Sequence, residues 1–326
     1  MMTNDISVFL SKLLCYNRIL IAGHVGPDAD CIGSLLALGR FLETRGKEVY
    51  LFVRDGCPEC FSFLEDAGRI LASPGPEALS SELLLLVDCS DIKRAGLEPE
   101  GVKSVKNRAV LDHHITAGEP ECSFGLTDPS ACSASMLVYR LILAANSQPD
   151  AVTSRAILTG IAGDTGAFRH SNTNAEVLAV AGDLTERGAD LHDIIKNLFL
   201  SRPKKVVSLL GRVLSGLRYF YGDKMVIAVI TNDAFEDIDK RELEGINSEI
   251  NSIKGLRLSA LLREEEKGSF RCSFRSDGYV DCSRLASVFG GGGHRNAAGC
   301  TLEGKTEEEA VEAVLKEAEN WKASFV

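Results

Sequence analysis

Three short apolar runs, each ending in aspartate or histidine, place the strongest constraint on how this chain can fold. They read RILIAGH at 18–24, LLLLVD at 83–88 and RAVLDH at 108–113. A strand with one face in water alternates apolar and polar residues, whereas these runs are apolar almost throughout. They therefore predict strands buried on both faces, as in a parallel sheet covered by helices.

Helical segments lie between and after these strands. Apolar residues recur at spacings of three and four in segments 33–44, 133–145, 153–162, 174–187 and 191–199. Residues 48–53 predict one further strand. The first part of the chain is thus predicted to be α/β, with a mainly parallel sheet flanked by helices.

The last third of the chain predicts a smaller α/β domain. Strands are expected at 224–230, 256–263 and 269–275, with the charged turn EEEKG joining the last two. Helices are expected at 238–253, 282–289 and 306–321, the last opened by the capping pair Thr306 and Glu309. A helix at 203–216, which contains lysine and arginine, could link the two domains.

Metal-binding residue types follow the predicted strands. In an open α/β sheet, ligands bind beyond the carboxyl ends of the strands. Aspartate and histidine together make a hard, oxygen-rich set that suits Mn²⁺ or Mg²⁺, and imidazole favours Mn²⁺. The candidates are His24, Asp28, Asp30, Asp88, Asp112, His113, His114 and Asp164.

Each candidate taken alone has a simpler interpretation. An aspartate after a strand more often caps a helix or sits in a turn, and a single histidine is more often a surface or core residue. Their joint occurrence at strand ends is what favours a metal site. Asp88 is the expected bridge between two cations, because a strand end can place it centrally. His170 and His192 lack this context and are interpreted as structural.

A run of glycines in the last third predicts a phosphate-binding element. Residues 290–294 read GGGGH. Gly291, Gly292 and Gly293 would let backbone N–H groups approach a phosphate closely, and His294 could donate to a phosphate oxygen. Arg275 and Ser276 end a predicted strand, where the guanidinium fork could hold another phosphate.

These motifs, in this order, resemble those of the DHH phosphoesterase superfamily over nearly the whole chain. His24-x-x-x-Asp28-x-Asp30 resembles the first motif, Asp88 in VDCSD the second, Asp112-His113-His114 the motif that names the family, and Gly160-Ile161-x-x-Asp164-Thr165-Gly166 the fourth. GGGGH followed by AAG at 297–299 resembles the signature of the associated DHHA1 domain. The resemblance implies a DHH catalytic, metal-binding domain at 1–187, a helical linker at 188–216 and a DHHA1 substrate-binding domain at 217–326. The active site would lie in the cleft between the domains.

The resemblance also implies two Mn²⁺ ions, with Mg²⁺ or another divalent cation as the alternative. His24, Asp28 and Asp164 would hold one ion, Asp30 and His113 the other, and Asp88 would bridge them. Asp112 and His114 would lie behind the ligands or near the scissile phosphate. Gly163 departs from the pattern, because many relatives carry threonine or serine there, but it is not a ligand.

Within the superfamily, the chain is most similar to the stand-alone nanoRNase/pAp phosphatase and cyclic-di-AMP phosphodiesterase group. This implies hydrolysis of very short oligoribonucleotides (nanoRNA) and 3′-phosphoadenosine-5′-phosphate (pAp). The expected mechanism is attack on phosphorus by a hydroxide that bridges the two ions. The alternative is a phosphodiesterase for cyclic-di-AMP or pApA.

Three other functions are less well supported. RecJ-like single-strand exonucleases are longer and carry an extra nucleic-acid-binding domain. The GGGGH-type C-terminal domain disfavours an inorganic pyrophosphatase. A catalytically silent nucleotide sensor should lack at least one metal ligand, yet every ligand position is filled.

Charge and apolar content limit the partners. The net charge of −10 favours short RNA oligonucleotides or small nucleotides over long duplex DNA. The longest aliphatic run, 83–87, is too short to span a bilayer, and no signal peptide or membrane partner is expected. Ten cysteines outside any regular framework are typical of free thiols in the cytoplasm. A homodimer remains an open alternative to a monomer.

Overall fold

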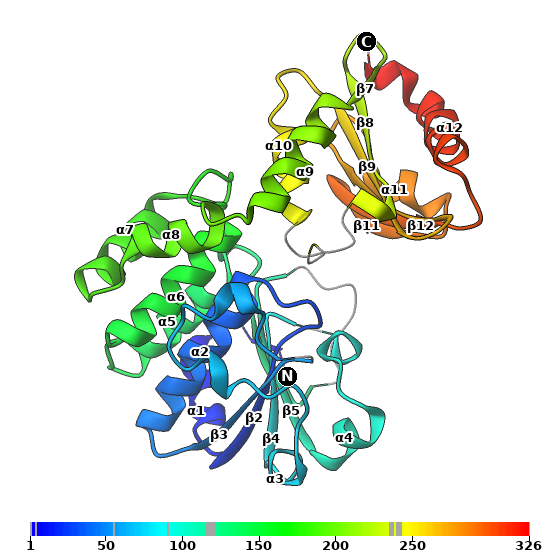
Figure 1. Cartoon of the computed structure of the whole chain (residues 1–326). Helices are drawn as coiled ribbons and strands as arrows, with labels where there is room; N and C mark the ends of the chain where they lie inside the picture. The colour runs from blue at the N-terminus through cyan, green and yellow to red at the C-terminus, as the bar shows by residue number, and fades with distance from the viewer. Residues whose placement is uncertain are drawn as a thin grey trace. The chain divides into compact units, whose positions relative to one another are not determined.

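The computed structural model describes residues 2–3, 5–54, 56–89, 91–114, 122–234, 238 and 243–325. The chain forms two compact units, Met1–Ser201 and Arg202–Val326, and each has its own sheet and helices (Figure 1). The predicted α/β class is therefore confirmed. Among the helices in these described ranges, none is both long enough and apolar enough to cross a membrane.

A parallel sheet forms the centre of the first unit. Its described strands have the order β1-β6-β5-β4-β2-β3, and every neighbouring pair is parallel. The mainly parallel sheet predicted from the apolar runs is thus confirmed. The strands are β1 (Met2–Thr3), β2 (Arg18–Ala22), β3 (Glu48–Phe52), β4 (Leu83–Val87), β5 (Asn107–Asp112) and β6 (Phe124–Thr127).

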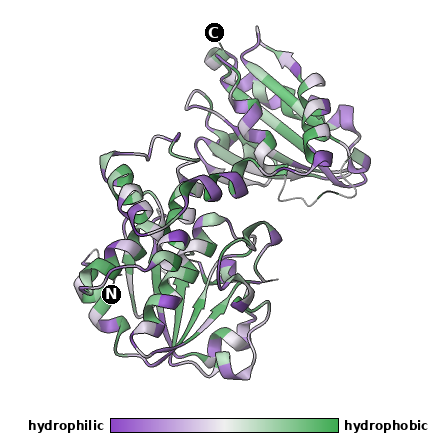
Figure 2. Cartoon of the chain, turned by 60° about the vertical axis from the view of Figure 1, so that its left-hand side comes forward, coloured by the Kyte–Doolittle hydropathy of each residue, from purple (hydrophilic) through white to green (hydrophobic). Residues whose placement is uncertain are grey.

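Both faces of this sheet are buried. In β2, Ile19 and Ile21 belong to one hydrophobic cluster, whereas Leu20 and Ala22 belong to another on the opposite face. Every residue of β4 is fully buried. The strands of both units are mostly hydrophobic in Figure 2, and hydrophilic positions concentrate on helices and loops. Burial on two faces explains why these strands have continuous apolar sequences.

Helices supply the apolar groups that cover the sheet. The larger cluster includes buried residues of α1, α2, α5, α6 and α7, and the smaller one includes a residue of α3. The helices are α1 (Ile6–Leu13), α2 (Ala29–Thr44), α3 (Pro76–Leu79), α4 (Pro99–Ser104), α5 (Ala134–Ala144), α6 (Ala151–Asp164), α7 (Ala175–Glu186) and α8 (Leu191–Phe199). Short 3₁₀ turns occur at Glu59–Phe61, Ala67–Arg69 and Ile92–Ala95.

Helices α2 and α6 approach each other closely through glycine. A Cβ atom added to Gly33 of α2 would collide with the carbonyl oxygen of Ala156 and lie 2.9 Å from the backbone nitrogen of Gly160. A Cβ added to Gly163 would lie 2.5 Å from the Cβ of Ala29. Glycine at these positions therefore lets the two backbones come into contact.

The second unit has a mixed sheet with the order β11-β12-β10-β9-β8-β7. Strands β8 and β9 are parallel, and the other pairs are antiparallel. The strands are β7 (Arg218–Phe220), β8 (Met225–Ile230), β9 (Leu258–Glu266), β10 (Ser269–Arg275), β11 (Gly292–His294) and β12 (Ala297–Leu302). The helices are α9 (Lys204–Ser215), α10 (Glu244–Asn251), α11 (Cys282–Ser287) and α12 (Glu307–Ala318), with 3₁₀ turns at Asn232–Ala234 and Glu319–Phe325.

Some predicted boundaries in this unit were wrong. The three glutamates of EEEKG continue β9, and only Lys267 and Gly268 form the turn, with Gly268 at φ +80°. Glu264 fits the strand because its carboxylate accepts from the backbone N–H groups of Gly268 and Asn232. Helix α10 begins at Glu244, and residues 239–242 of the predicted helix lie outside the described residues.

The start of the last helix follows the sequence closely. The predicted capping box is confirmed, because the side chains of Thr306 and Glu309 each accept from the other's backbone N–H. The predicted linker segment contains α8 and α9, and the boundary between the two compact units falls between these helices.

We expect Gly33→Ala to destabilise the first unit by roughly 1–3 kcal/mol, because the added methyl group overpacks α2 against α6. The matched control is Gly182→Ala in α7, where a Cβ meets nothing within 4 Å. That change should stabilise by about 0.5–1 kcal/mol, the helix-propensity difference. Urea denaturation of both variants measures the two effects, and equal effects would contradict the close contact.

A second prediction concerns Asp150, which caps α6 and pairs with Arg40. Its carboxylate accepts from Thr153 N (2.8 Å) and from Arg40 Nη2 (2.8 Å). Partial burial alone would raise its pKa, but the hydrogen bonds from Arg40 and Thr153 hold the pKa at about 2.

Since this pKa lies below the value of about 3.9 in an unfolded chain, the stabilisation is present above pH 4 and is lost as the pH falls towards 2. Asp150→Asn keeps a capping oxygen but removes the titration. The stability difference between wild type and this variant should therefore shrink between pH 5 and pH 2.5 in chemical denaturation. A difference that does not change with pH would contradict the assignment.

Candidate metal centre

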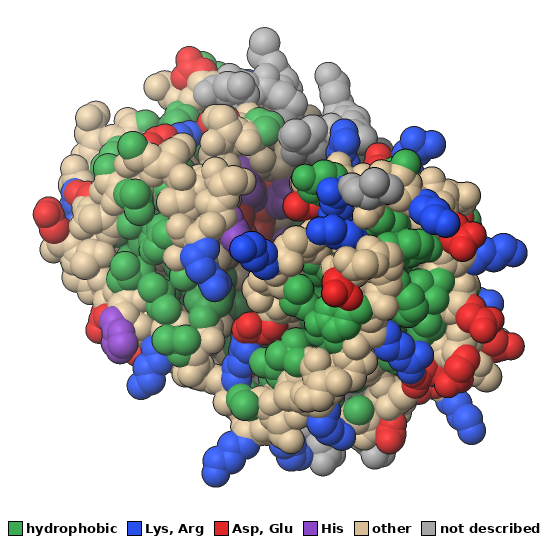
Figure 3. Space-filling model, turned by 90° about the horizontal axis from the view of Figure 1, so that it is seen from above, with side chains coloured by type: hydrophobic (Ala, Val, Ile, Leu, Met, Phe, Trp, Pro, Cys, Tyr) green, Lys and Arg blue, Asp and Glu red, His purple; other side chains and the backbone are tan. Residues whose placement is uncertain are grey.

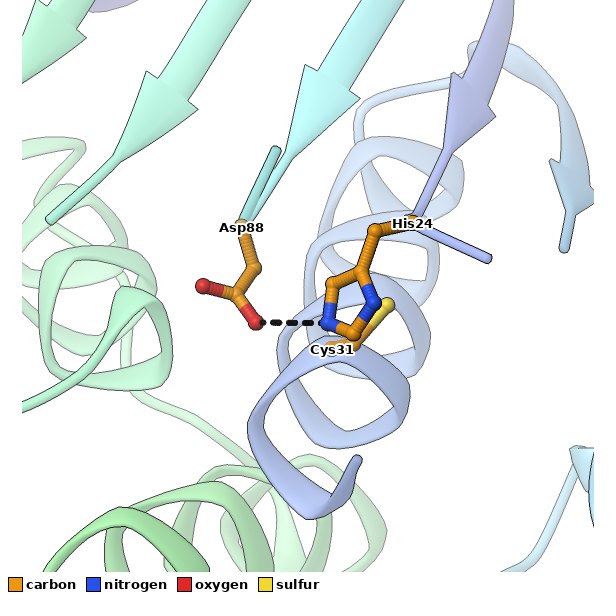
Figure 4. A group of neighbouring side chains, drawn as sticks. All are labelled: His24, Cys31 and Asp88. Carbon is orange, nitrogen blue, oxygen red and sulfur yellow. Dashed lines mark ion pairs between the residues drawn. The ribbon is translucent and has the colours of Figure 1, made fainter. Parts of the chain in front are cut away.

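Three strands of the first sheet bring two histidines and an aspartate together. His24 follows β2, Asp88 follows β4 and His113 follows β5. Parallel strands end at the same edge, so these residues meet. Asp88 Oδ2 lies 3.5 Å from Nε2 of His24, and Asp88 Oδ1 lies 3.5 Å from Nε2 of His113. The carboxylate of Asp88 therefore lies between two imidazoles. Figure 4 shows its contact with the ring of His24.

The first turn of α2 adds two carboxylates. Asp28 caps the helix, with Oδ1 accepting from the backbone N–H groups of Asp30 and Cys31 at 3.0 Å each. Asp30 is fully buried, and its two oxygens accept from the N–H groups of Ala134 and Ser135 at 2.6 and 2.8 Å. The helix-cap interpretation of Asp28 is thus correct. It does not exclude a metal, because the same side chain also approaches His24, at 3.9 Å.

Asp164 reaches the cluster from the last residue of α6. Its Oδ2 lies 3.2 Å from Nε2 of His113, and Asp30 Oδ2 lies 3.8 Å from the same nitrogen. Ligand atoms of these three residues all lie within 4.8 Å of one another. The glycine contact between α2 and α6 permits this arrangement, since Asp30 precedes Gly33 by one helical turn and Asp164 follows Gly160 by one turn. Asp164 thus belongs to a group with His113 and Asp30, whereas His24 belongs to a separate group with Cys31 and Asp88.

The ring of His24 is oriented by its own backbone. Nδ1 lies 3.0 Å from the carbonyl oxygen of Val25, and since a carbonyl only accepts, Nδ1 is the donor in this contact. Nε2 is then directed at the carboxylates of Asp28 and Asp88. A histidine that binds a metal through one nitrogen usually donates from the other to a carbonyl or carboxylate. His24 has this orientation.

The electrostatics of the cluster favour added positive charge. Burial raises the pKa of Asp30 well above its usual range, and the charges of Asp88 and Asp164 raise it further. Burial alone would lower the pKa of His113, but its interactions with Asp164 and Asp88 raise it to about 11. The carboxylates therefore hold protons on neighbouring groups, which is a role that a cation can take over.

Two facing atoms in this cluster lack hydrogen bonds. Asp88 Oδ1 and His113 Nε2 are both buried, and among the described residues neither makes a hydrogen bond of good geometry, although each lies within 3.5 Å of an ionisable side chain. A buried polar atom without a partner is unusual and calls for an explanation such as an ion. Histidine nitrogens and carboxylate oxygens at this spacing are donors suited to a divalent cation. The residues present thus fit a metal centre, and histidines beside acidic side chains are visible in Figure 3.

Asp112 and His114 form a pair beside the centre. Asp112 is buried, and its Oδ1 accepts from Nδ1 of His114 at 2.8 Å and from the backbone N–H of His114 at 3.2 Å. The hydrogen bond with Asp112 raises the pKa of His114. The His114 side chain is 40% exposed, so this imidazole is accessible from solvent.

Two kinds of neighbour were not predicted from the sequence. Cys31, on α2, groups with His24 and Asp88, and its thiol lies next to the His24 ring in Figure 4. Burial raises the pKa of Cys31 to about 11. His170 Nδ1, at 3.1 Å, and Asn172 Nδ2, at 3.3 Å, donate to the backbone carbonyl of Asp164. The only sequence signal for Cys31 is its position directly after Asp30.

The predicted phosphate-binding residues lie on the second sheet. Ala297 of β12 pairs with Arg275 of β10 on one side and with His294 of β11 on the other. Residues in register across adjacent strands point to the same face, so Arg275 and His294 share a face about 10 Å apart. Ser276 follows Arg275, and its hydroxyl accepts from the backbone N–H of Val280 at 3.0 Å.

The glycine run has a packing role that the sequence did not predict. A Cβ on Gly291 would collide with the carbonyl oxygen of Gly299, and one on Gly293, at φ +142°, would lie 2.6 Å from the Cα of Ala298. These two glycines are required by the close contact with β12. Gly292 is different, because a Cβ there meets nothing within 4 Å. Its open side is where a ligand could approach the backbone.

Comparison with known proteins places the chain in a family. Residues 18–165 match the DHH family N-terminal domain, and residues 222–324 match the DHHA1 domain. The bifunctional oligoribonuclease and PAP phosphatase NrnA of Thermus thermophilus is 36% identical over 302 residues, which cover 91% of this chain and 88% of that protein. The cyclic-di-AMP phosphodiesterase PdeA of Listeria monocytogenes is 25% identical over 328 residues, which cover 95% of this chain and 49% of PdeA.

A solved structure agrees with these matches. The crystal structure of an exopolyphosphatase-related protein from Bacteroides fragilis superimposes with a TM-score of 0.90 at 27% identity, covering 98% of this chain and 97% of that one. One family match lies in each unit, and the two domains follow each other in the order that the sequence motifs predict, DHH before DHHA1. The chain therefore belongs to the DHH family of phosphoesterases and carries a DHHA1 domain after its DHH domain.

Proposed function

We propose that this chain is a divalent-cation-dependent phosphoesterase that hydrolyses very short oligoribonucleotides and pAp. The observation that carries the proposal is the buried carboxylate of Asp88 between the imidazoles of His24 and His113, with facing atoms that lack hydrogen bonds. The substrate class is supported by the similarity to the Thermus thermophilus protein named oligoribonuclease and PAP phosphatase.

In this proposal six side chains hold two cations, with Mn²⁺ preferred over Mg²⁺ because two of the donors are imidazoles. Asp88 serves both ions. The distances favour His24 and Asp28 for one ion, and Asp30, His113 and Asp164 for the other. When bound, the ions would neutralise phosphate charge and acidify a water molecule.

The remaining residues position the phosphate and handle the proton. His114 donates from Nδ1 to Asp112, and this hydrogen bond raises the pKa of the imidazole and so favours its charged form. In that form its Nε2–H would be available to a phosphate oxygen or the leaving oxygen. Asp112 acts through this hydrogen bond. Arg275 is permanently cationic and suits a phosphate rather than a metal. Ser276, His294 and the backbone of 291–293 would complete the phosphate contacts.

A second candidate substrate is pApA or cyclic-di-AMP. The similarity to PdeA favours it, and the same metal centre would serve, because the scissile group is a phosphodiester, as it is in a short oligoribonucleotide. The cytoplasm is the proposed compartment, consistent with the free thiols of buried Cys31, Cys89 and Cys132.

Metal binding should be detectable without an activity assay. Mn²⁺ at about 100 times its dissociation constant should raise the unfolding temperature by roughly 5–10 °C, because it binds only the folded cluster. His113→Ala should lose most of this shift, and Asp88→Ala should lose nearly all of it.

The matched control for this experiment is His192→Ala, which removes an exposed histidine of α8. It should keep the full Mn²⁺ shift, and so should Arg275→Ala. If Arg275→Ala or His192→Ala lost the shift as His113→Ala does, the assignment of the ligands would be wrong.

Substrate length provides the test of the proposed activity. Rates on pAp, pApA, cyclic-di-AMP and an RNA of about twenty nucleotides should be measured with Mn²⁺ under one set of conditions. We expect pApA and pAp to be cut with a kcat/KM at least about tenfold above that of the long RNA. Equal efficiency on all lengths, or full activity after exhaustive chelation, would overturn the proposal. A preference for cyclic-di-AMP would favour the second candidate.

A further inference from the structure

A pocket of 460 Å³ opens in the second unit where β8 and β9 begin and β10 ends. Small-molecule sites commonly have volumes of about 300–1,000 Å³. Arg275 and Ser276 line this pocket, whereas Gly291, Gly292, Gly293 and His294 do not. The pocket therefore extends beyond the predicted phosphate contacts, along residues to which the DHH and DHHA1 motifs assign no role.

The charge of the pocket is opposite to that of the chain. Lys224, Arg257 and Arg275 line it, against a single acidic residue, Asp277. The whole chain carries a net charge of −10. A concave site with three cations in an acidic protein favours a small anion with more than one negative charge.

An aromatic ring forms part of the wall. Tyr279 lines the pocket with its side chain half exposed, and the guanidinium carbon of Arg257 lies 4.3 Å from the centroid of its ring. Arg257 is itself held in place, since Nη1 donates to the carbonyl oxygen of Ser324 at 2.7 Å. The loop that carries Tyr279 is anchored by buried Val280, whose N–H donates to Ser276. A fixed cation thus lies against one face of the ring, and much of the ring is open to solvent.

We propose that this pocket is a nucleotide subsite in which a nucleobase stacks on Tyr279 and the adjoining phosphate lies between Lys224 and Arg275. The nucleotide bound there would be part of the proposed substrate, so this inference rests on the proposed function. Aromatic stacking accepts any base, because every base has a π face. The pocket would therefore select substrates with a base at this position, without selecting its sequence.

The test compares Tyr279→Ala and Tyr279→Phe with Tyr219→Ala as the matched control. Tyr219 is also about half exposed, but it lies on the edge strand β7 and does not line the pocket. The substrates are pApA and two analogues of it. One analogue has hydrogen in place of the first adenine, and the other has hydrogen in place of the second. We expect Tyr279→Ala to raise KM for pApA roughly 5- to 150-fold, the range for loss of one stacked base, with little change in kcat.

The analogues make the test specific to stacking. For one of them, wild type and Tyr279→Ala should have the same KM, because the base that would stack is absent. Tyr279→Phe should behave like wild type on pApA, and Tyr219→Ala should too. If Tyr279→Ala matched wild type on pApA, or if Tyr279→Phe lost as much as Tyr279→Ala, the subsite would be wrong. Thermal unfolding of each variant excludes a folding defect, which is not expected for a half-exposed side chain.

Binding of AMP by calorimetry separates this proposal from the proposed function, since it needs no hydrolysis. AMP binding that weakens in Tyr279→Ala, in a protein that hydrolyses no short nucleotide, would support the subsite and overturn the function. Hydrolysis of pApA with AMP binding equal in wild type and Tyr279→Ala would support the function and overturn the subsite.

Discussion

The contact between α2 and α6 is the constraint on which the rest of the first unit depends. Gly33 and Gly160 lie so close that a methyl group on either would collide with the opposite helix or with α5. Asp30 and Asp164 each lie about one turn from that contact, on different helices. Asp30 then accepts two N–H groups at the start of α5. The positions of three helices and two carboxylates thus depend on glycine at these contacts.

The sheet supplies the complementary part of the centre. Because its strands are parallel, the residues after β2, β4 and β5 meet at one edge, and the apolar faces above and below leave little water to solvate them. Burial raises the pKa of Asp30, and the neighbouring carboxylates raise it further; against the effect of burial, the carboxylates also raise the pKa of His113. The fold therefore creates a concentrated negative charge that only cations or protons can balance.

Much of this could be predicted from the sequence, for identifiable reasons. Strands buried on both faces carry an unambiguous apolar signal, and strand ends in a parallel sheet must converge. Short strands such as β6 (FGLT) carry too few residues for a pattern, and β9 continues through glutamates because tertiary hydrogen bonds support them. The spacing of apolar residues along the chain cannot reveal the hydrogen-bond partners of these glutamates.

The site was predicted less completely than the fold. Residue types at strand ends identified the acidic and histidine groups, but the grouping of Asp164 with His113 depends on how far α6 approaches α2, and no local pattern encodes that distance. Gly291 and Gly293 were interpreted through phosphate binding, whereas β12 requires them for packing. A glycine run indicates that side chains are excluded, but not which neighbour excludes them.

Asp88 combines its central position with an unfavourable backbone. Its φ of 53° lies in the left-handed region, which aspartate tolerates better than most residues but less well than glycine, and its carboxylate is buried among like charges. Glycine at this position would relax the backbone and remove a buried charge. A population selected only for thermal tolerance should therefore drift away from aspartate here, and its persistence in a lineage would record selection for chemistry against stability.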